Sequence, residues 1–270
     1  MAMENSQGTF SLDRHIESIP ALETSRMRLF LVLQDEDADL ERVECVISSD
    51  PAMAAKVVKL ANSPFYRHAN QFLGIHQSLL TIGLDMVKCI TLSMAVMDTL
   101  RCESRYAKSL WSHSYATALI ALSLGRGKAE KDCLFTGALL HDLGKMVFLS
   151  RAPETYIPLV AFEGSWPDSD LERDVFSVDH TLLGESVARS WHFPEEIVRI
   201  IRDHHSPKDL NSAIVYLINH VICRYEKGET EALAPDSRTI RSYLGDMYKD
   251  LVNTILQRYK MNNVIVENLF

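Results

Sequence analysis

Residues 139–145 read Leu-Leu-His-Asp-Leu-Gly-Lys, so an apolar helical segment ends in a histidine, an aspartate and a lysine. The imidazole nitrogen and the carboxylate oxygen are neighbouring ligands that suit Fe, Mn, Zn or Mg, and the lysine offers a cation to a phosphate group. A His-Asp pair by itself often arises by chance and commonly only caps a helix. Whether this stretch is a metal site therefore depends on the sequence around it.

The segments on both sides of this stretch have helical rather than alternating periodicity. Asp50 followed by Pro51 predicts a helix start, with an N-cap acid and a proline at the first helical position. The apolar stretch 78–100 is expected to break near Gly83, and residues 153–175, which hold several prolines and glycines, are predicted to be irregular. Further helices are expected over 109–124, 131–141, 178–191, 194–204 and 212–225, and near the C-terminus. Because no strand pattern appears, the predicted fold class is all-α.

The composition is typical of a globular protein, with 47% hydrophobic and 24% charged residues among 270. The net charge of −8 argues against a nucleic-acid-binding protein, because such affinity comes mostly from neutralising phosphates. The five cysteines are scattered singly, which predicts reduced, mostly buried thiols rather than a disulfide framework. Neither a signal-peptide pattern nor an apolar run of 18 residues appears, so we expect a cytoplasmic protein that does not span a membrane.

Four further histidines strengthen the case for a metal site. His113 lies in an apolar setting on the preceding predicted helix, His180 heads a later helix, and His204 and His205 end the helix after that. Taken singly, each would more often be a core or capping histidine. Taken together, several helices each deliver a ligand-type residue near an end or an inward face, which is how helical bundles build metal sites in their cores.

The remaining histidines are expected to have other roles. His15, His68 and His76 are predicted to face solvent, and His192 is predicted to be a packed corner residue beside a tryptophan. His220 points about 100° around its helix from its neighbour Asn219. We therefore expect it to contact the ligand residues at most, and not to bind the metal itself.

The order of these motifs resembles that of HDOD proteins, a branch of the HD superfamily of metal-dependent phosphohydrolases. The resemblance covers roughly residues 12–225. It rests on segments in the N-terminal half at 18–22, 49–53, 60–66 and 78–84, and in the second half at 110–114, 137–144, 179–180, 191–194 and 204–207.

The resemblance implies an N-terminal helical part, residues 12–105, packed on an HD-like helical bundle, residues 106–225. Residues 1–11 would be a flexible tail and residues 226–270 a C-terminal helical extension. HDOD proteins are generally regarded as bacterial signalling modules, which implies regulation through protein partners.

The resemblance also implies a ligand set. Catalytic HD enzymes use the pattern H…HD…D, and its first three members match His113, His141 and Asp142. The middle members of the related HD-GYP cyclic-dinucleotide phosphodiesterases match His180, His204 and His205. Asp142 would bridge the metals, and Lys145 matches a lysine that contacts phosphate.

The sequence departs from these patterns at two acidic positions. Asn219 stands where the last aspartate is expected, and Ser109 stands where HD-GYP proteins have an acid four residues before the first histidine. The GYP signature after His205 is also missing. The remaining site is neutral and rich in histidine, which favours one or two Fe, Mn or Zn ions over Mg.

Two functions follow from these observations. The first is a regulatory HDOD module that acts through protein contacts and retains most of the metal site. The second is a metal-dependent phosphohydrolase or phosphodiesterase that acts on a nucleotide or cyclic dinucleotide. The sequence does not indicate the substrate, the partner or the oligomeric state.

Overall fold

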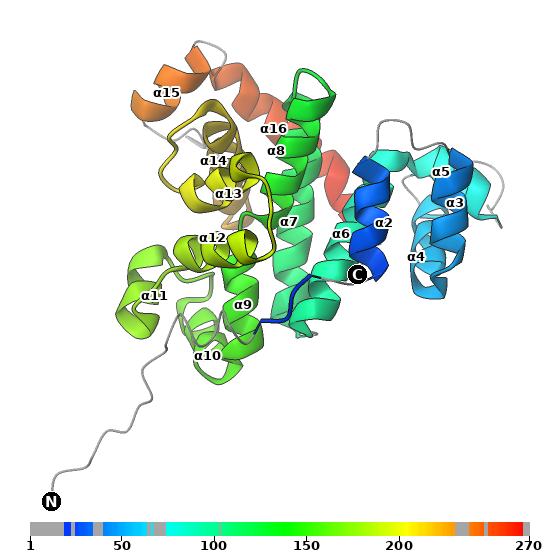
Figure 1. Cartoon of the computed structure of the whole chain (residues 1–270). Helices are drawn as coiled ribbons and strands as arrows, with labels where there is room; N and C mark the ends of the chain where they lie inside the picture. Colours follow the sequence, from blue (N-terminus) through cyan, green and yellow to red (C-terminus); the bar gives the residue numbers. More distant parts are fainter. Residues whose placement is uncertain are drawn as a thin grey trace, which may run out of the picture.

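The computed structural model describes residues 19–22, 25–34, 40–63, 66, 74–102, 104–229, 238–245 and 248–266. Within these ranges the regular structure is helical and no strand occurs (Figure 1), so the predicted all-α class is confirmed. The proposed tail, residues 1–11, lies outside the described residues, and the boundaries at 105 and 225 stay a prediction.

The described residues of the N-terminal part form α2 (Ser25–Gln34), α3 (Leu40–Ser48), α4 (Pro51–Ala61), α5 (Ile75–Ile82) and α6 (Leu84–Leu100). Asp50 caps α4 as predicted, because its side chain accepts hydrogen bonds from the backbone of Ala52 and Met53. The expected break near Gly83 is also confirmed, since this residue separates α5 from α6.

The HD-like part follows as eight helices: α7 (Arg105–Leu124), α8 (Lys128–Leu140), α9 (Leu143–Arg151), α10 (Pro153–Glu163), α11 (Ser169–Phe176), α12 (His180–Ser190), α13 (Glu195–Asp203) and α14 (Leu210–Glu226). The prediction that residues 153–175 are irregular was wrong, because α10 and most of α11 occupy them. Tyr156 of α10 and Phe176 of α11 both stack on Phe148 of α9, with ring centroids 5.0 and 4.5 Å away. This long-range aromatic packing holds the two helices in place.

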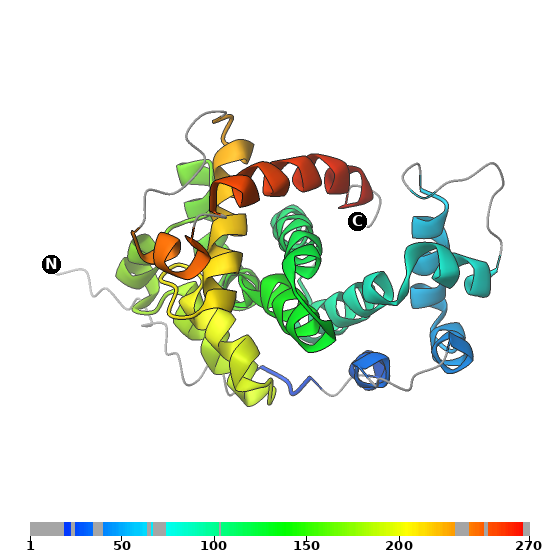
Figure 2. The same ribbon diagram turned by 90° about the horizontal axis from the view of Figure 1, so that it is seen from above.

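The two parts meet along α6 and the N-terminal segment. Helices α3, α4 and α5 stand to one side in Figures 1 and 2, and α6 leads from them toward the central pair α7 and α8. Helix α2 packs on α6. The indole Nε1 of Trp191 donates a hydrogen bond to the carbonyl oxygen of Pro20 at 3.1 Å, which ties the start of the described chain to the HD-like part.

Two C-terminal helices complete the fold, α15 (Arg238–Leu244) and α16 (Tyr248–Val266). Helix α16 runs beside the HD-like part in Figure 2 and packs against α7 and α14. Its buried side chains include Ile255 and Tyr259. The C-terminal extension is therefore packed onto the two helices that carry His113 and Asn219.

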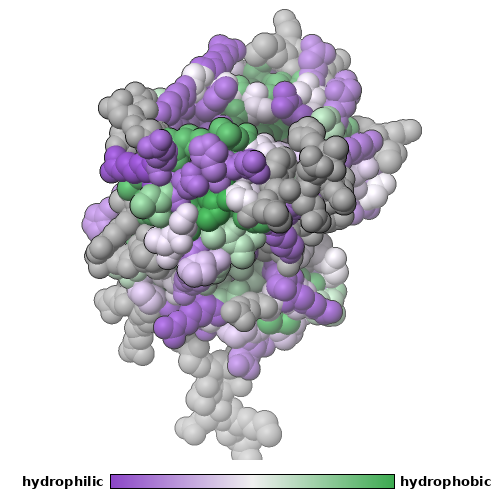
Figure 3. All heavy atoms as spheres, turned by 90° about the vertical axis from the view of Figure 1, so that its right-hand side faces the viewer, coloured by the Kyte–Doolittle hydropathy of each residue, from purple (hydrophilic) through white to green (hydrophobic). Residues whose placement is uncertain are grey.

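One described segment, residues 128–151, is long and apolar enough to cross a membrane, but 89% of its most apolar window is buried inside the protein. A bent pair, α5 with α6, passes the same test only when its two helices are joined. On the coloured part of the face in Figure 3, hydrophobic areas are interrupted by hydrophilic side chains. Residues 128–151 are thus part of the core of this fold.

The cysteines for which burial is described are free thiols. Cys102 is buried, Cys133 and Cys223 are partly exposed, and Cys45 is exposed. Among these four thiols Cys45 is the exception to the expected burial, and the other three are buried at least in part.

Candidate metal centre

His141 and His204 occupy equivalent positions, each directly after the last residue of a helix. His141 follows α8 and its Nδ1 lies 2.7 Å from the carbonyl oxygen of Ala138, while His204 follows α13 and its Nδ1 lies 2.8 Å from that of Ile201. A carbonyl only accepts hydrogen bonds, so Nδ1 carries the proton in both rings and Nε2 presents a lone pair. The ring centroids are 5.0 Å apart, and both rings are fully buried.

Close helix contacts bring these two residues together. A Cβ atom added to Gly137 of α8 would lie 2.5 Å from a side-chain carbon of Ile200 of α13, so only glycine allows this approach. On the neighbouring pair, a Cβ atom on Gly144 of α9 would overlap the carbonyl oxygen of His180 at the start of α12. The Gly in the sequence motif at 139–145 thus serves helix packing and not a turn, because Gly144 lies inside α9.

Asp142 lies at the centre of the cluster. Its carboxylate oxygens are 3.3 Å from Nε2 of His141 and 3.6 Å from Nε2 of both His180 and His204. Lys145, one turn later, places its Nζ 3.0 Å from the same carboxylate. Both side chains are buried, so their charges compensate each other.

His180 is held by a residue that sequence reasoning missed. Its Nδ1 lies 2.5 Å from Oε2 of Glu172 on α11, and its backbone N–H donates to the same oxygen at 2.7 Å. Glu172 is fully buried and also accepts a hydrogen bond from the hydroxyl of Tyr156 at 2.6 Å. A carboxylate on Nδ1 leaves Nε2 of His180 as the ligand atom, and this Nε2 lies 3.0 Å from Nε2 of His205.

His113 and Asn219 form the other side of the cluster. Nε2 of His113 lies 2.9 Å from Oδ1 of Asn219, and its ring centroid is 5.5 Å from that of His141. Asn219 also accepts a hydrogen bond from the thiol of Cys223 at 3.2 Å. A second residue missed from the sequence, Glu226, places Oε2 3.8 Å from Nδ1 of His113.

The arrangement fits a divalent cation. Two groups of side chains each have ligand atoms within 4.8 Å of one another: Asp142 with His180, His204 and His205, and Asp142 with His113 and His141. Three atoms at their centre are buried without a hydrogen-bond partner: Nε2 of His141, Oδ1 of Asp142 and Nε2 of His204. Oδ1 of Asp142 is compensated by the Lys145 ammonium 3.0 Å away, whereas the two imidazole nitrogens have no partner. A buried acceptor without a partner is costly, and a cation between these nitrogens and the carboxylate would satisfy them.

The charges of the cluster are set by burial and by Lys145. Burial alone would raise the pKa of Asp142, but the Lys145 ammonium and His141 hold this pKa well below its ordinary value. Burial opposes the charge of Lys145 as well, yet Asp142 raises the pKa of this lysine. Burial lowers the pKa of His204 to about 4, so its ring is neutral and able to bind a metal near neutral pH.

The cluster opens into a cavity of about 560 Å³. His113, Asp142, Lys145 and His205 lie in its wall, and so does Arg173, whose guanidinium pairs with Asp170 and Asp179. The cavity therefore presents two lysines and one arginine together with several carboxylates and two imidazoles.

The other candidate residues lie away from this centre. Ser109 is exposed on α7, so no side chain at that position replaces the missing acid. His76 is exposed as expected and contacts Glu44, while His220 packs on Tyr216 and belongs to neither ligand group. His15 and His68 lie outside the described residues. His192 turns a corner with φ 59° but is exposed, so the prediction that it is packed was wrong.

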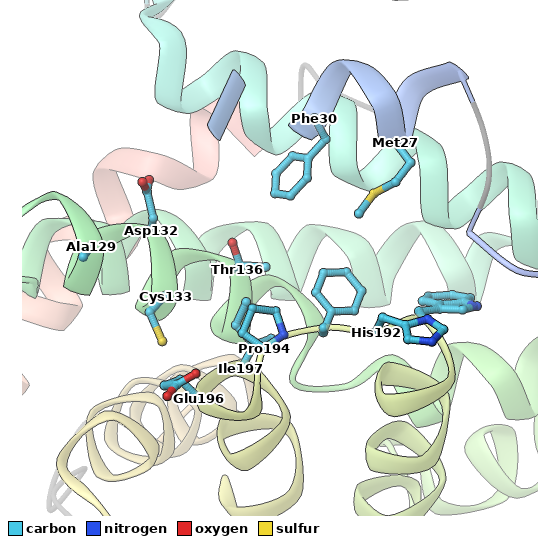
Figure 4. Close-up of a pocket in the computed structure, with 12 residues that line it drawn as sticks. Met27, Phe30, Ala129, Asp132, Cys133, Thr136, His192, Pro194, Glu196 and Ile197 are labelled. Atoms are coloured by element: carbon cyan, nitrogen blue, oxygen red, sulfur yellow. The ribbon is translucent and has the colours of Figure 1, made fainter. Parts of the chain in front are cut away.

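A second cavity of about 460 Å³ lies between the N-terminal and HD-like parts. Figure 4 shows Met27 and Phe30 of α2 pointing toward the turn that carries His192 and Pro194, across from Thr136 of α8. Its lining is mostly apolar and contains none of the predicted metal ligands. The candidate metal ligands therefore adjoin the first cavity and not this one.

Comparisons with known proteins agree with this geometry. The profile of the HDOD domain matches residues 19–207. An uncharacterized protein of Treponema pallidum is 27% identical over 201 residues, which cover 73% of this chain and 39% of that protein. A dihydroneopterin 2′,3′-cyclic phosphate phosphodiesterase of Methanocaldococcus jannaschii is 29% identical over 126 residues, 43% of this chain and 45% of that enzyme. This chain thus matches less than half the length of either curated relative.

Solved structures share the fold. An HDOD domain protein of unknown function from Geobacter sulfurreducens superposes with a TM-score of 0.72 at 24% identity, covering 96% of this chain and 97% of the other. A protein of Marinobacter aquaeolei, assigned provisionally to signal transduction, has a TM-score of 0.75 at 18% identity, covering 96% of this chain and 61% of the other. A Shewanella amazonensis protein assigned provisionally as a phosphohydrolase has a TM-score of 0.72 at 19% identity, covering 97% of this chain and 99% of the other.

Proposed function

This chain belongs to the HDOD domain family, and from that premise we propose that it is a metal-binding signal-transduction module that acts through protein contacts. Its proposed ligands are His113, His141, Asp142, His180, His204 and His205, with Asn219 at the position of the last acid. The proposed partners are signalling proteins, and a cytoplasmic location stays a prediction.

One observation carries the metal site: Nε2 of His141 and Nε2 of His204 are buried without a hydrogen-bond partner, and both face the carboxylate of Asp142, which is paired with Lys145. Each such group costs roughly 1–3 kcal/mol when it is left unsatisfied. Because five imidazoles and one carboxylate make up the set, borderline ions such as Fe(II) and Zn suit it better than Mg.

The surrounding residues prepare this set for a cation. Glu172 fixes the tautomer of His180, and the backbone carbonyls of Ala138 and Ile201 fix those of His141 and His204. Lys145 keeps Asp142 ionised. A divalent cation held there would supply Lewis acidity, which lowers the pKa of water toward ~7 and stabilises negative charge on a phosphoryl group.

Elemental analysis of protein purified without oxygen or added chelator tests this proposal. We expect about one or two equivalents of Fe, Mn or Zn per chain, the number that such a site can hold. The double substitution His141→Ala/Asp142→Ala should abolish metal retention while the helical circular-dichroism signal remains. A folded wild-type protein without metal, even after loading with Fe(II), Mn or Zn, would refute the site.

A metal-dependent phosphohydrolase or phosphodiesterase acting on a nucleotide is the second candidate. It is favoured by the cavity beside the cluster, which contains Lys145 and Arg173, and by the name of the Methanocaldococcus jannaschii relative. It is opposed by the neutral Asn219 and by the exposed Ser109, which leave the site two carboxylates short of the HD-GYP pattern.

Hydrolysis of cyclic nucleotides and cyclic dinucleotides by the metal-loaded protein distinguishes the two candidates. Turnover that Lys145→Ala lowers at unchanged metal content would favour the enzyme, because this lysine lies where a phosphate would enter. Metal retention without turnover would favour the signalling module.

A further inference from the structure

Two buried histidines of the cluster share an arrangement that the sequence motifs did not indicate. In the first case, the hydroxyl of Tyr156 donates to one oxygen of Glu172, and the other oxygen of Glu172 faces Nδ1 of His180. The distances are 2.6 and 2.5 Å, and all three side chains are fully buried or nearly so. This tyrosine–glutamate–histidine chain holds one side of the cluster.

The second chain lies on the opposite side. The hydroxyl of Tyr259 on α16 donates to one oxygen of Glu226 at 2.6 Å, and the other oxygen of Glu226 faces Nδ1 of His113 at 3.8 Å. Glu226 ends α14 and lines the same cavity as His113 and Asp142. Tyr259 is buried, so the helix that carries it is fixed against the site.

The two tyrosine–glutamate–histidine chains differ in the exposure of the glutamate and in its distance from the histidine. The side chain of Glu172 is fully buried, whereas that of Glu226 is 43% exposed and lies more than 1 Å farther from its histidine. Glu226 and Tyr259 lie beyond residue 207, where the family match ends, whereas His113 lies within it. The C-terminal extension thus reaches a site that the HDOD match covers only in part.

We infer that Glu226 and Tyr259 position His113 for metal binding, so that helix α16 tunes the metal affinity of the site. This inference rests on the proposed metal centre. Histidine ligands almost always donate their other N–H to a carboxylate or carbonyl, which fixes the ring and strengthens the ligand. Glu226 is the carboxylate that faces Nδ1 of His113, at 3.8 Å and thus at ion-pair rather than hydrogen-bond distance. Tyr259 holds that carboxylate in place.

Zinc affinity, measured by competition with a chromogenic chelator on the full chain, tests the inference. Loss of such a partner typically weakens metal binding about 10–100-fold, so we expect this loss for Glu226→Gln and a smaller one for Tyr259→Phe. The matched controls are Glu229→Gln, three residues further along the chain, and Tyr225→Phe, whose ring packs edge-on against Tyr259 at 5.8 Å. Both controls should bind zinc as the wild type does.

A double substitution separates positioning from a general structural role. If Tyr259 acts through Glu226, Glu226→Gln/Tyr259→Phe should bind zinc no more weakly than Glu226→Gln alone. The visible spectrum of the cobalt-loaded protein should change in Glu226→Gln, because it reports the orientation of the ligands. Full additivity of the two losses would overturn the positioning role.

The outcomes distinguish the two proposals. Wild-type protein that binds neither zinc nor cobalt would refute the metal centre and this inference with it. Wild-type protein that binds zinc, with unchanged affinity and cobalt spectrum in Glu226→Gln, would refute only the role of Glu226 and α16.

Discussion

Asn219 is the residue at which this site departs most clearly from the H…HD…D pattern. Its amide oxygen lies 2.9 Å from Nε2 of His113, so this uncharged side chain adjoins one of the proposed ligands. A neutral amide oxygen is a weaker ligand than a carboxylate. The cluster therefore contains one anionic side chain, Asp142, among its proposed ligands.

Replacing Asn219 with Asp should strengthen metal binding, because the new carboxylate would adjoin His113 at the edge of the cluster. We expect roughly a tenfold gain in zinc affinity, about 1.4 kcal/mol. Asn211→Asp is the matched control, since it adds the same charge at the start of the same helix, where Asn211 contacts Cys133. Equal affinity of Asn219→Asp and the wild type would mean that position 219 does not adjoin the metal.

The sequence motifs identified the side chains that meet in the cluster, because His113, His141, His180, His204 and His205 recur at motif positions. They did not identify Glu172 or Glu226. Glu172 falls in the segment that was predicted to be irregular, and Glu226 falls just after the helix that was predicted over 212–225. Neither residue stands beside a ligand in the sequence, and only folding brings each carboxylate to its histidine.

The packing of α9 against α12 holds the residues of the candidate metal centre in place. Gly144 of α9 meets the carbonyl of His180, and Gly184 of α12 lies against the backbone nitrogen of Gly144. The Asp179 side chain caps α12 by accepting hydrogen bonds from Thr181 and Leu182, so His180 stands at the first position of a fixed helix. Oδ1 of Asp142 and Nε2 of His180 are thereby held 3.6 Å apart.

Gly144→Ala should separate these helices, because the added methyl group meets backbone and not a flexible side chain. We expect a loss of about 1–3 kcal/mol in the free energy of unfolding, as for other overpacked contacts, together with reduced metal content. Chemical denaturation and elemental analysis measure the two effects. Gly74→Ala serves as control, since nothing lies within 4 Å of a Cβ at that position, and both quantities should stay near wild type.

Helices α10 and α11 show where local sequence rules fail. Pro158 lies inside α10 and would ordinarily end a helix, because it lacks an N–H and crowds the preceding turn. The stacking of Tyr156 and Phe176 on Phe148 compensates for that local cost. Since Phe148 lies outside residues 153–175, the periodicity of that segment did not indicate this stacking. Helices α4 and α5, by contrast, were indicated by local signals in their own sequence.

In the molecule as a whole, several ionisable side chains are buried where the helices of the HD-like part meet. The two C-capping histidines, Asp142, Lys145 and Glu172 are all within the core. Neutral buried imidazoles make the folded state sensitive to acid, because the unfolded chain binds protons that the folded chain does not.

The metal-free protein should therefore lose stability as the pH falls from 6.5 to about 4, the interval between the ordinary pKa of histidine and that of His204. In this interval only the unfolded state protonates this residue, so the free energy of unfolding decreases on acidification, by about 3 kcal/mol in total. Chemical denaturation after chelator treatment measures it. His204→Asn should flatten the dependence, while His76→Asn, at an exposed position, should leave it unchanged.

The hydrogen bond from Trp191 to Pro20 spans 171 positions of the chain, and this separation governs the order of events during synthesis. At about 5–20 residues per second, roughly 10–30 s pass between the emergence of Pro20 and that of Trp191. During that interval Met27 and Phe30 lack the turn at 192–194 that they face in the finished protein. The nascent N-terminal helices therefore expose these apolar side chains to solvent until the turn at 192–194 has been synthesised and can cover them.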